Sequence, residues 1–132
     1  MRRRWAAGLL SLVLAAGCGS SSDASIKKHL LRGVAQIRTT RDRAELHAKL
    51  VRTLANLRRD HASTAAERRA RRLAIEGFEA TLKGVRSQLD FVENDSGNVA
   101  AATRDARRAD RYLALGASRL RAAGMALGIR IR

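Results

Sequence analysis

The chain has 132 residues, and its 27 Lys and Arg against 12 Asp and Glu give a net charge of +15. The length allows one domain, and a single cysteine excludes an intramolecular disulfide framework and a cysteine-rich zinc site. A hydrophobic content of 45% argues against a wholly disordered chain, and the absence of Pro favours long helices over a β fold with many turns.

The N-terminal segment has the features of an export signal. Three arginines, Arg2–Arg4, precede an uncharged, mostly apolar run of twelve residues from Trp5 to Ala16. That run is shorter than the roughly 20 residues that span a bilayer, and it has the length of the apolar region of a signal peptide. Cys18, the only cysteine, follows the small residues Ala16 and Gly17.

The segment Leu14-Ala15-Ala16-Gly17-Cys18 resembles the lipobox of bacterial lipoproteins, with Ala15 where Leu is more usual. In that family a diacylglyceryl group is attached to the cysteine thiol and the peptide is cut before the cysteine. The resemblance covers residues 1–19 and implies cleavage of residues 1–17 and lipid attachment at Cys18. It also implies a location on the extracytoplasmic face of the cell membrane, or on the outer membrane of a cell with two membranes. Two alternatives stay open: a secretory signal with an unmodified Cys18, and an uncleaved N-terminal helix.

Cleavage would leave 115 residues with a net charge of +12. Residues 18–25 then form a lipidated tether, because Gly19–Ser25 is polar and has nothing to bury. As a flexible linker, this segment would reach about 13–16 Å.

A first helix is predicted over residues 25–60. Ile26, Leu30, Val34 and Ile37 recur at spacings of three and four, which marks one helical face. The apolar stripe thins near Arg38–Arg43, so a break there stays open as an alternative.

A second helix is predicted over residues 64–92. Thr64 and Glu67 have the spacing of a capping box, in which each side chain bonds the other residue's backbone N–H. A heptad seam follows at Ile75, Phe78, Leu82, Val85, Leu89 and Val92.

The polar segment 93–98 predicts a loop, and a third helix is predicted over residues 98–123. Its apolar stripe runs from Val99 to Ala123, with small residues at Ala102, Ala106, Ala109 and Gly116 that permit close helix packing. Gly124 is the predicted helix stop, and residues 125–132 are predicted to be a loosely ordered tail. Together the three segments predict an all-α fold, an antiparallel up-down-up three-helix bundle over residues 26–124.

No pattern in the chain indicates catalysis, a metal or a cofactor. His29, His47 and His61 are too far apart along a helix to share a metal, and no Glu-x-x-His pair is present. Because no nucleophile elbow and no phosphate-binding glycine loop occurs, we expect that the protein is not an enzyme.

Arginine is the unusual feature of the composition. Two groups lie opposite the apolar stripes of the second and third predicted helices: Arg68, Arg69, Arg71 and Arg72, and then Arg104, Arg107, Arg108 and Arg111. With 23 Arg against 4 Lys, genome composition is an alternative explanation of this excess.

The expected function is that of a non-catalytic envelope lipoprotein whose basic helical surface interacts with anionic lipid or with an envelope polymer. The main alternative is an adaptor that docks on another envelope protein through an amphipathic helical face, and self-association also stays open because heptad seams serve dimers. Nucleic acid is disfavoured as a partner, because export removes the protein from the cytoplasm and the exported part keeps only three aromatic residues.

Overall fold

The computed structural model describes residues 21–93 and 97–132, and these residues form four helices. The helices are α1 (Ser21–Thr39), α2 (Arg43–Arg59), α3 (Ala65–Glu93) and α4 (Val99–Ala126). The all-α prediction is confirmed, and no strand occurs in the described part of the chain. The three-helix count is wrong, because the single helix predicted over residues 25–60 is two helices.

The break between α1 and α2 lies at residues 40–42, and local hydrogen bonds explain it. The hydroxyl of Thr39 donates to the Ala35 carbonyl, which occupies an acceptor in the last turn of α1. Asp42 is the N-cap of α2, and its carboxylate accepts the Glu45 N–H at 2.7 Å. An N-cap carboxylate of this kind starts a new helix in place of continuing the old one.

The capping box at the start of α3 is confirmed. The Glu67 N–H donates to Thr64 Oγ1 at 3.1 Å, and the Thr64 N–H donates to Glu67 Oε2 at 3.2 Å. Asn98 caps α4 by accepting the Ala101 N–H.

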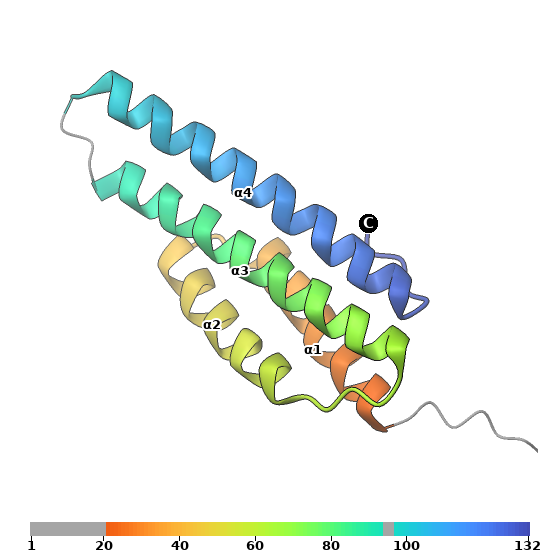
Figure 1. Ribbon diagram of the computed structural model, residues 1–132. Helices are drawn as coiled ribbons and strands as arrows, with labels where there is room; N and C mark the ends of the chain where they lie inside the picture. The colour runs from red at the N-terminus through yellow and green to blue at the C-terminus, as the bar shows by residue number, and fades with distance from the viewer. Residues whose placement is uncertain (1–20, 94–96) are drawn as a thin grey trace, which may run out of the picture.

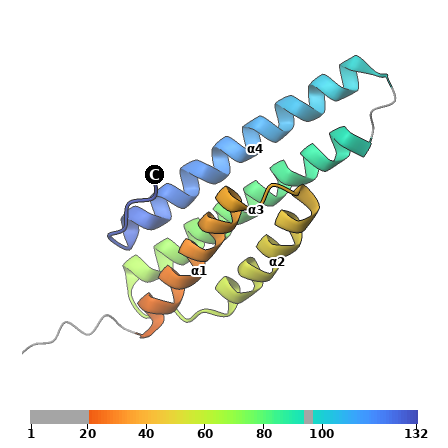
Figure 2. The same ribbon diagram turned by 180° about the vertical axis from the view of Figure 1, so that it is seen from behind.

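The helices form a long antiparallel hairpin, α3–α4, with α1 and α2 packed on one side of it (Figure 1). Figure 2 shows the same layer from behind. Helix α3 contacts every other described helix, whereas α1 contacts α4 sparsely and α2 does not pack on α4. As a result, the opposite side of the hairpin is left uncovered by α1 and α2.

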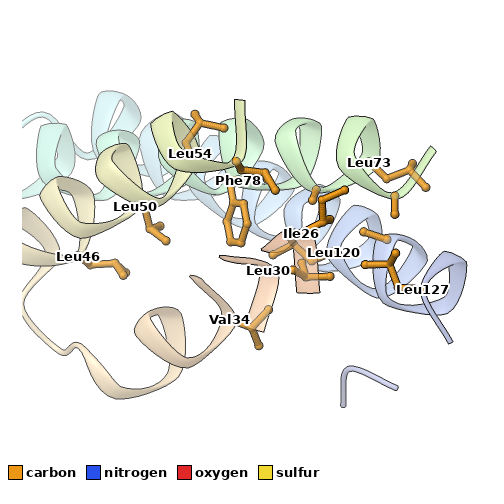
Figure 3. Packing of buried hydrophobic residues seen from close by; sticks show 14 of the residues in the cluster. Ile26, Leu30, Val34, Leu46, Leu50, Leu54, Leu73, Phe78, Leu120 and Leu127 are labelled. Carbon is orange, nitrogen blue, oxygen red and sulfur yellow. The ribbon is translucent and has the colours of Figure 1, made fainter. Parts of the chain in front are cut away.

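The core lies where α1 and α2 meet α3 (Figure 3). The largest fully buried side chains include Phe78 of α3, Ile26 and Leu30 of α1, and Leu46 and Leu50 of α2. The stripe predicted at Ile26, Leu30 and Val34 therefore supplies the α1 part of this core.

Glycines set the register between α3 and α4. A Cβ at Gly77 would lie 2.8 Å from the Leu120 side chain, and one at Gly84 would lie 2.8 Å from Leu113. A Cβ at Gly116 would lie 2.9 Å from the Gly77 carbonyl oxygen. Leu113 and Leu120 thus pack over glycines of α3. This packing fixes which residue of α3 lies opposite each residue of α4.

The seam predicted along α3 and α4 is correct near the core and wrong at the end of the hairpin. Val85 and Leu120 are buried, but Val92 is 70% exposed and Val99 is 77% exposed. In both ribbon views the hairpin extends past the start of α2, so these valines lack a third helix to cover them (Figures 1 and 2).

Both ends of the predicted bundle need correction. Residues 21–25 belong to α1 and not to a flexible tether, because Ser22 Oγ donates to Glu67 Oε2 and Ser25 Oγ donates to Asp60 Oδ1. Gly124 lies inside α4, and the glycine with positive φ that follows the helix is Gly128.

The predicted loose tail is also ordered by packing. Its first two residues, Met125 and Ala126, belong to α4, and Leu127 is buried. Ile129 and Ile131 then pack against the core. These apolar contacts hold residues 127–132 against the bundle.

Candidate functional site

The two predicted arginine groups lie at opposite ends of the α3–α4 hairpin. The first group is in the first two turns of α3, and the second is in the first half of α4. Since the glycine register places Gly77 opposite Leu120 and Gly84 opposite Leu113, the second group lies beside the last two turns of α3. At 1.5 Å per residue the two groups are about 30 Å apart.

Both groups nevertheless contribute to one surface, the side of the hairpin that α1 and α2 leave uncovered. Arg119 marks this side on α4, because it lies about 160° around the helix from Ala117, which lines a pocket with residues of α1. Arg119 Nε lies 3.5 Å from Glu76 Oε2 of α3, and Lys83 Nζ lies 5.8 Å from the centroid of the Tyr112 ring. A helical rotation of 100° per residue places Arg69 and Arg72 within about 60° of Glu76 and Lys83 on α3.

The same rotation places basic residues of α4 in one sector with Arg119. We call the resulting surface the outer face, and its basic residues are Arg69, Arg72 and Lys83 of α3 and Arg104, Arg108, Arg111 and Arg119 of α4. All seven are exposed. The outer face is therefore a basic strip along the whole hairpin.

Three of the eight predicted arginines do not belong to this strip. Arg71 turns toward α2, where its Nε donates to the Leu57 carbonyl at 3.2 Å and its Nη2 donates to the Arg58 carbonyl at 2.5 Å. These bonds satisfy carbonyls at the C-terminal end of α2, so Arg71 has a structural role. Arg68 donates to the Ser63 carbonyl. Arg107 lies about 120° around α4 from Arg119, farther than any α4 arginine of the strip.

Carboxylates neutralise only part of the outer face. Arg119 pairs with Glu76, and Arg108 lies 4.0 Å from Asp105. Among residues 21–93 and 97–132, no acidic partner lies within ion-pair distance of Arg69 or Arg72, nor of two arginines of α4, Arg104 and Arg111. These four guanidinium groups carry uncompensated charge toward solvent.

Sequence patterns missed two members of the strip, Lys83 and Arg119, because neither lies in a run of basic residues. A signal was present in the spacing, since Lys83 follows Arg69 by fourteen residues and Arg119 follows Arg108 by eleven. Both intervals are close to whole numbers of helical turns.

A second polar group joins the start of α1 to the end of α2, where Asp60 is the C-cap. Ser25 Oγ donates to Asp60 Oδ1 at 2.6 Å, and His29 Nδ1 lies 2.5 Å from Asp60 Oδ2. Asp60 therefore sits between the hydroxyl and the imidazole. A nucleophilic serine needs the imidazole itself as its hydrogen-bond acceptor, and that bond is not among those His29 makes in the described structure.

The sequence contained no hint that His29 would pair with Asp60, because the two residues are 31 positions apart. The pair fastens α1 to the end of α2.

Within the described ranges, no three His, Cys, Asp or Glu side chains are grouped as metal ligands. No helix there combines the length and apolar character needed to cross a bilayer.

The predicted lipid-attachment residue, Cys18, and the predicted signal peptide lie outside the described residues. Comparison of the chain with protein-family models, with curated proteins and with solved structures finds no match.

Proposed function

We propose that this protein is a non-catalytic lipoprotein, anchored through Cys18 to the extracytoplasmic face of a cell membrane, whose outer face rests on anionic lipid headgroups or an acidic envelope polymer. The lipobox supports the anchor. The uncovered basic strip is the single observation that carries the binding function, because α1 and α2 pack only on the other side of the hairpin.

The position of the anchor favours contact between this strip and the same membrane. Cys18 lies three residues before Ser21, the first residue of α1, so the helix begins within about 11 Å of the lipid. Ser22 contacts Ser63 and Glu67, which places the start of α1 beside the start of α3. Arg69 and Arg72 are therefore at the anchored end of the hairpin.

Charge then favours a bundle that lies along the membrane. A basic residue close to an anionic bilayer contributes about 1 kcal/mol, and the effect fades within a Debye length of about 8 Å. Arg104 and Arg111, about 30 Å away along the hairpin, come within this range only if the outer face lies flat on the surface.

Charge reversal at the outer face should abolish binding to anionic vesicles. In a chain of residues 19–132, Arg69, Arg72, Arg104 and Arg111 are all replaced with Glu. Each substitution turns attraction into repulsion at a surface-exposed site. Binding of the unmodified chain to vesicles containing phosphatidylglycerol, measured by co-sedimentation, should also fall as salt rises from about 50 to 500 mM.

The matched control reverses four exposed basic residues of the α1–α2 layer, Lys28, Arg32, Arg41 and Arg52. Its change in net charge is identical, but we expect it to retain most of the binding. Equal losses in the two variants would mean that net charge alone matters and would contradict the outer face as the binding surface. Circular dichroism should show the same helicity in both.

Lipidation at Cys18 has its own test. Intact mass spectrometry of protein extracted from membranes should show the loss of residues 1–17 and an added diacylglyceryl mass. Cys18→Ser should prevent both processing and membrane attachment, because it removes the only thiol. A soluble product that begins at another residue would disprove the anchor.

An adaptor function is the second candidate, and the end of the hairpin favours it. Phe91, Val92 and Val99 are 41%, 70% and 77% exposed there. An apolar helix of another envelope protein could cover them. Such binding would persist at high salt, whereas binding through the outer face would not.

A further inference from the structure

A pocket with a cavity volume of about 260 Å³ lies between α1 and α4, on the side of the hairpin opposite the outer face. Its walls are apolar side chains: Val34 and Ile37 of α1, Leu113 and Leu120 of α4, and Ile131. Thr81 of α3 also lines it, but its hydroxyl donates to the Gly77 carbonyl at 2.8 Å and is already satisfied. Water inside such a pocket would find few hydrogen-bond partners.

Four arginines also line this pocket, and no Asp or Glu side chain lines it. They come from different parts of the chain: Arg38 lies in α1, Arg43 is the first residue of α2, Arg121 lies in α4, and Arg132 follows α4. None of the four forms an ion pair with an Asp or Glu side chain of the described residues. Arg38 donates one hydrogen bond to the main-chain oxygen of Arg132 and keeps its remaining donors.

The combination of apolar and basic lining residues defines the class of ligand. Guanidinium groups bind carboxylate and phosphate through paired hydrogen bonds, and four of them lining one pocket attract an anion. Apolar walls favour a hydrocarbon chain. A cavity of about 150 Å³ holds the six carbons of benzene, so by proportion this pocket accommodates about ten carbons.

We propose that this pocket binds a single-chain anionic amphiphile, with its hydrocarbon chain between α1 and α4 and its carboxylate or phosphate among Arg38, Arg43, Arg121 and Arg132. The site shares no residue with the outer face. The two proposals can therefore fail independently.

Photolabelling of the full-length chain in phosphatidylcholine nanodiscs tests this assignment. The probe is decanoate with a diazirine at the end of its chain, and labelled residues are mapped by mass spectrometry. Labels should concentrate on Val34, Leu113 and Ile131. Excess decanoate or decyl phosphate should remove them, and the stronger competitor identifies the preferred headgroup.

Two further competitors test the two halves of the ligand. Decanol has the chain without the charge, and inorganic phosphate has the charge without the chain. Neither should compete as well as decanoate. Equal competition by decanol would show that the arginines play no part, and full competition by phosphate would show that the walls play none; either result overturns the proposal.

Two pairs of variants complete the test. Ala117 lines the pocket and Ala114 does not, although both are exposed on α4. Ala117→Phe should reduce labelling about tenfold by filling the cavity, whereas Ala114→Phe should leave it unchanged. The double replacement Arg43→Gln and Arg121→Gln should weaken decanoate competition about tenfold, and Lys28→Gln with Arg52→Gln, two exposed basic residues that do not line the pocket, should not. Equal labelling of the two Phe variants, or equal decanoate competition in the two Gln double variants, would overturn the proposal.

Discussion

Replacing Phe78 with Ala should lower the free energy of unfolding by about 3–5 kcal/mol, the range for deleting a buried phenyl ring. Phe78 is fully buried in the core cluster (Figure 3). Its ring tip fills the space that a Cβ at Gly33 of α1 would need, and the same position lies 3.1 Å from the Thr53 methyl of α2. The Phe78 side chain thus packs α3 against α1. Urea unfolding followed by circular dichroism measures the loss.

The second phenylalanine of the chain provides the control. Phe91 is on the same helix but 41% exposed, so Phe91→Ala should cost under about 1 kcal/mol. Gly33→Ala adds a further check, because it overpacks the Phe78 ring in the natural chain and should be destabilising. Combined with Phe78→Ala it should become neutral or stabilising, since Ala favours a helix over Gly. Equal costs at Phe78 and Phe91 would contradict the core as described.

Glu67→Ala should cost about 2–4 kcal/mol, because it removes one acceptor from three donors. Glu67 is only 4% exposed. Its Oε2 accepts the Ser63 N–H at 2.6 Å, the Thr64 N–H at 3.2 Å and the Ser22 hydroxyl at 2.9 Å. The carboxylate therefore caps α3 and also fastens the start of α1 to it. The same urea titration measures this loss.

Two variants separate hydrogen bonding from simple loss of charge. Glu67→Gln keeps an oxygen acceptor in the same place and should cost roughly half as much as the Ala variant. Glu76→Ala removes a carboxylate from a partly exposed cross-helix ion pair and should cost under about 1 kcal/mol. If Glu67→Ala were no worse than Glu76→Ala, the capping network would not be a major source of stability.

The features that were predictable from sequence are those that depend on neighbouring residues. The capping box needs only Thr64 and Glu67, three positions apart, and it is present as predicted. The break at residues 40–42 had a similar local signal, since Asp42 precedes Glu45 by three positions. The sequence still permits one continuous helix, because apolar residues continue at helical spacing on both sides of the break.

Features that depend on packing between distant segments could not be predicted in the same way. The sequence predicts a helix stop at Gly124, whereas α4 continues to Ala126 and Gly128 follows it with positive φ. Ile129 and Ile131, which follow this glycine, pack against the core. The outer face is a similar case. Each helix showed a basic stripe, but the glycine register between α3 and α4 determines that Arg72 and Arg104 share one side.

The arrangement of helices around α3 also has a kinetic consequence. Most contacts between helices join consecutive elements: α1 with α2, α2 with α3, and α3 with α4. Chains dominated by contacts between sequence neighbours fold on the microsecond-to-millisecond scale, because little loop-closure entropy is lost before contacts form. A chain of this topology exposes its apolar helix faces only briefly, which limits the time in which unfolded copies can aggregate.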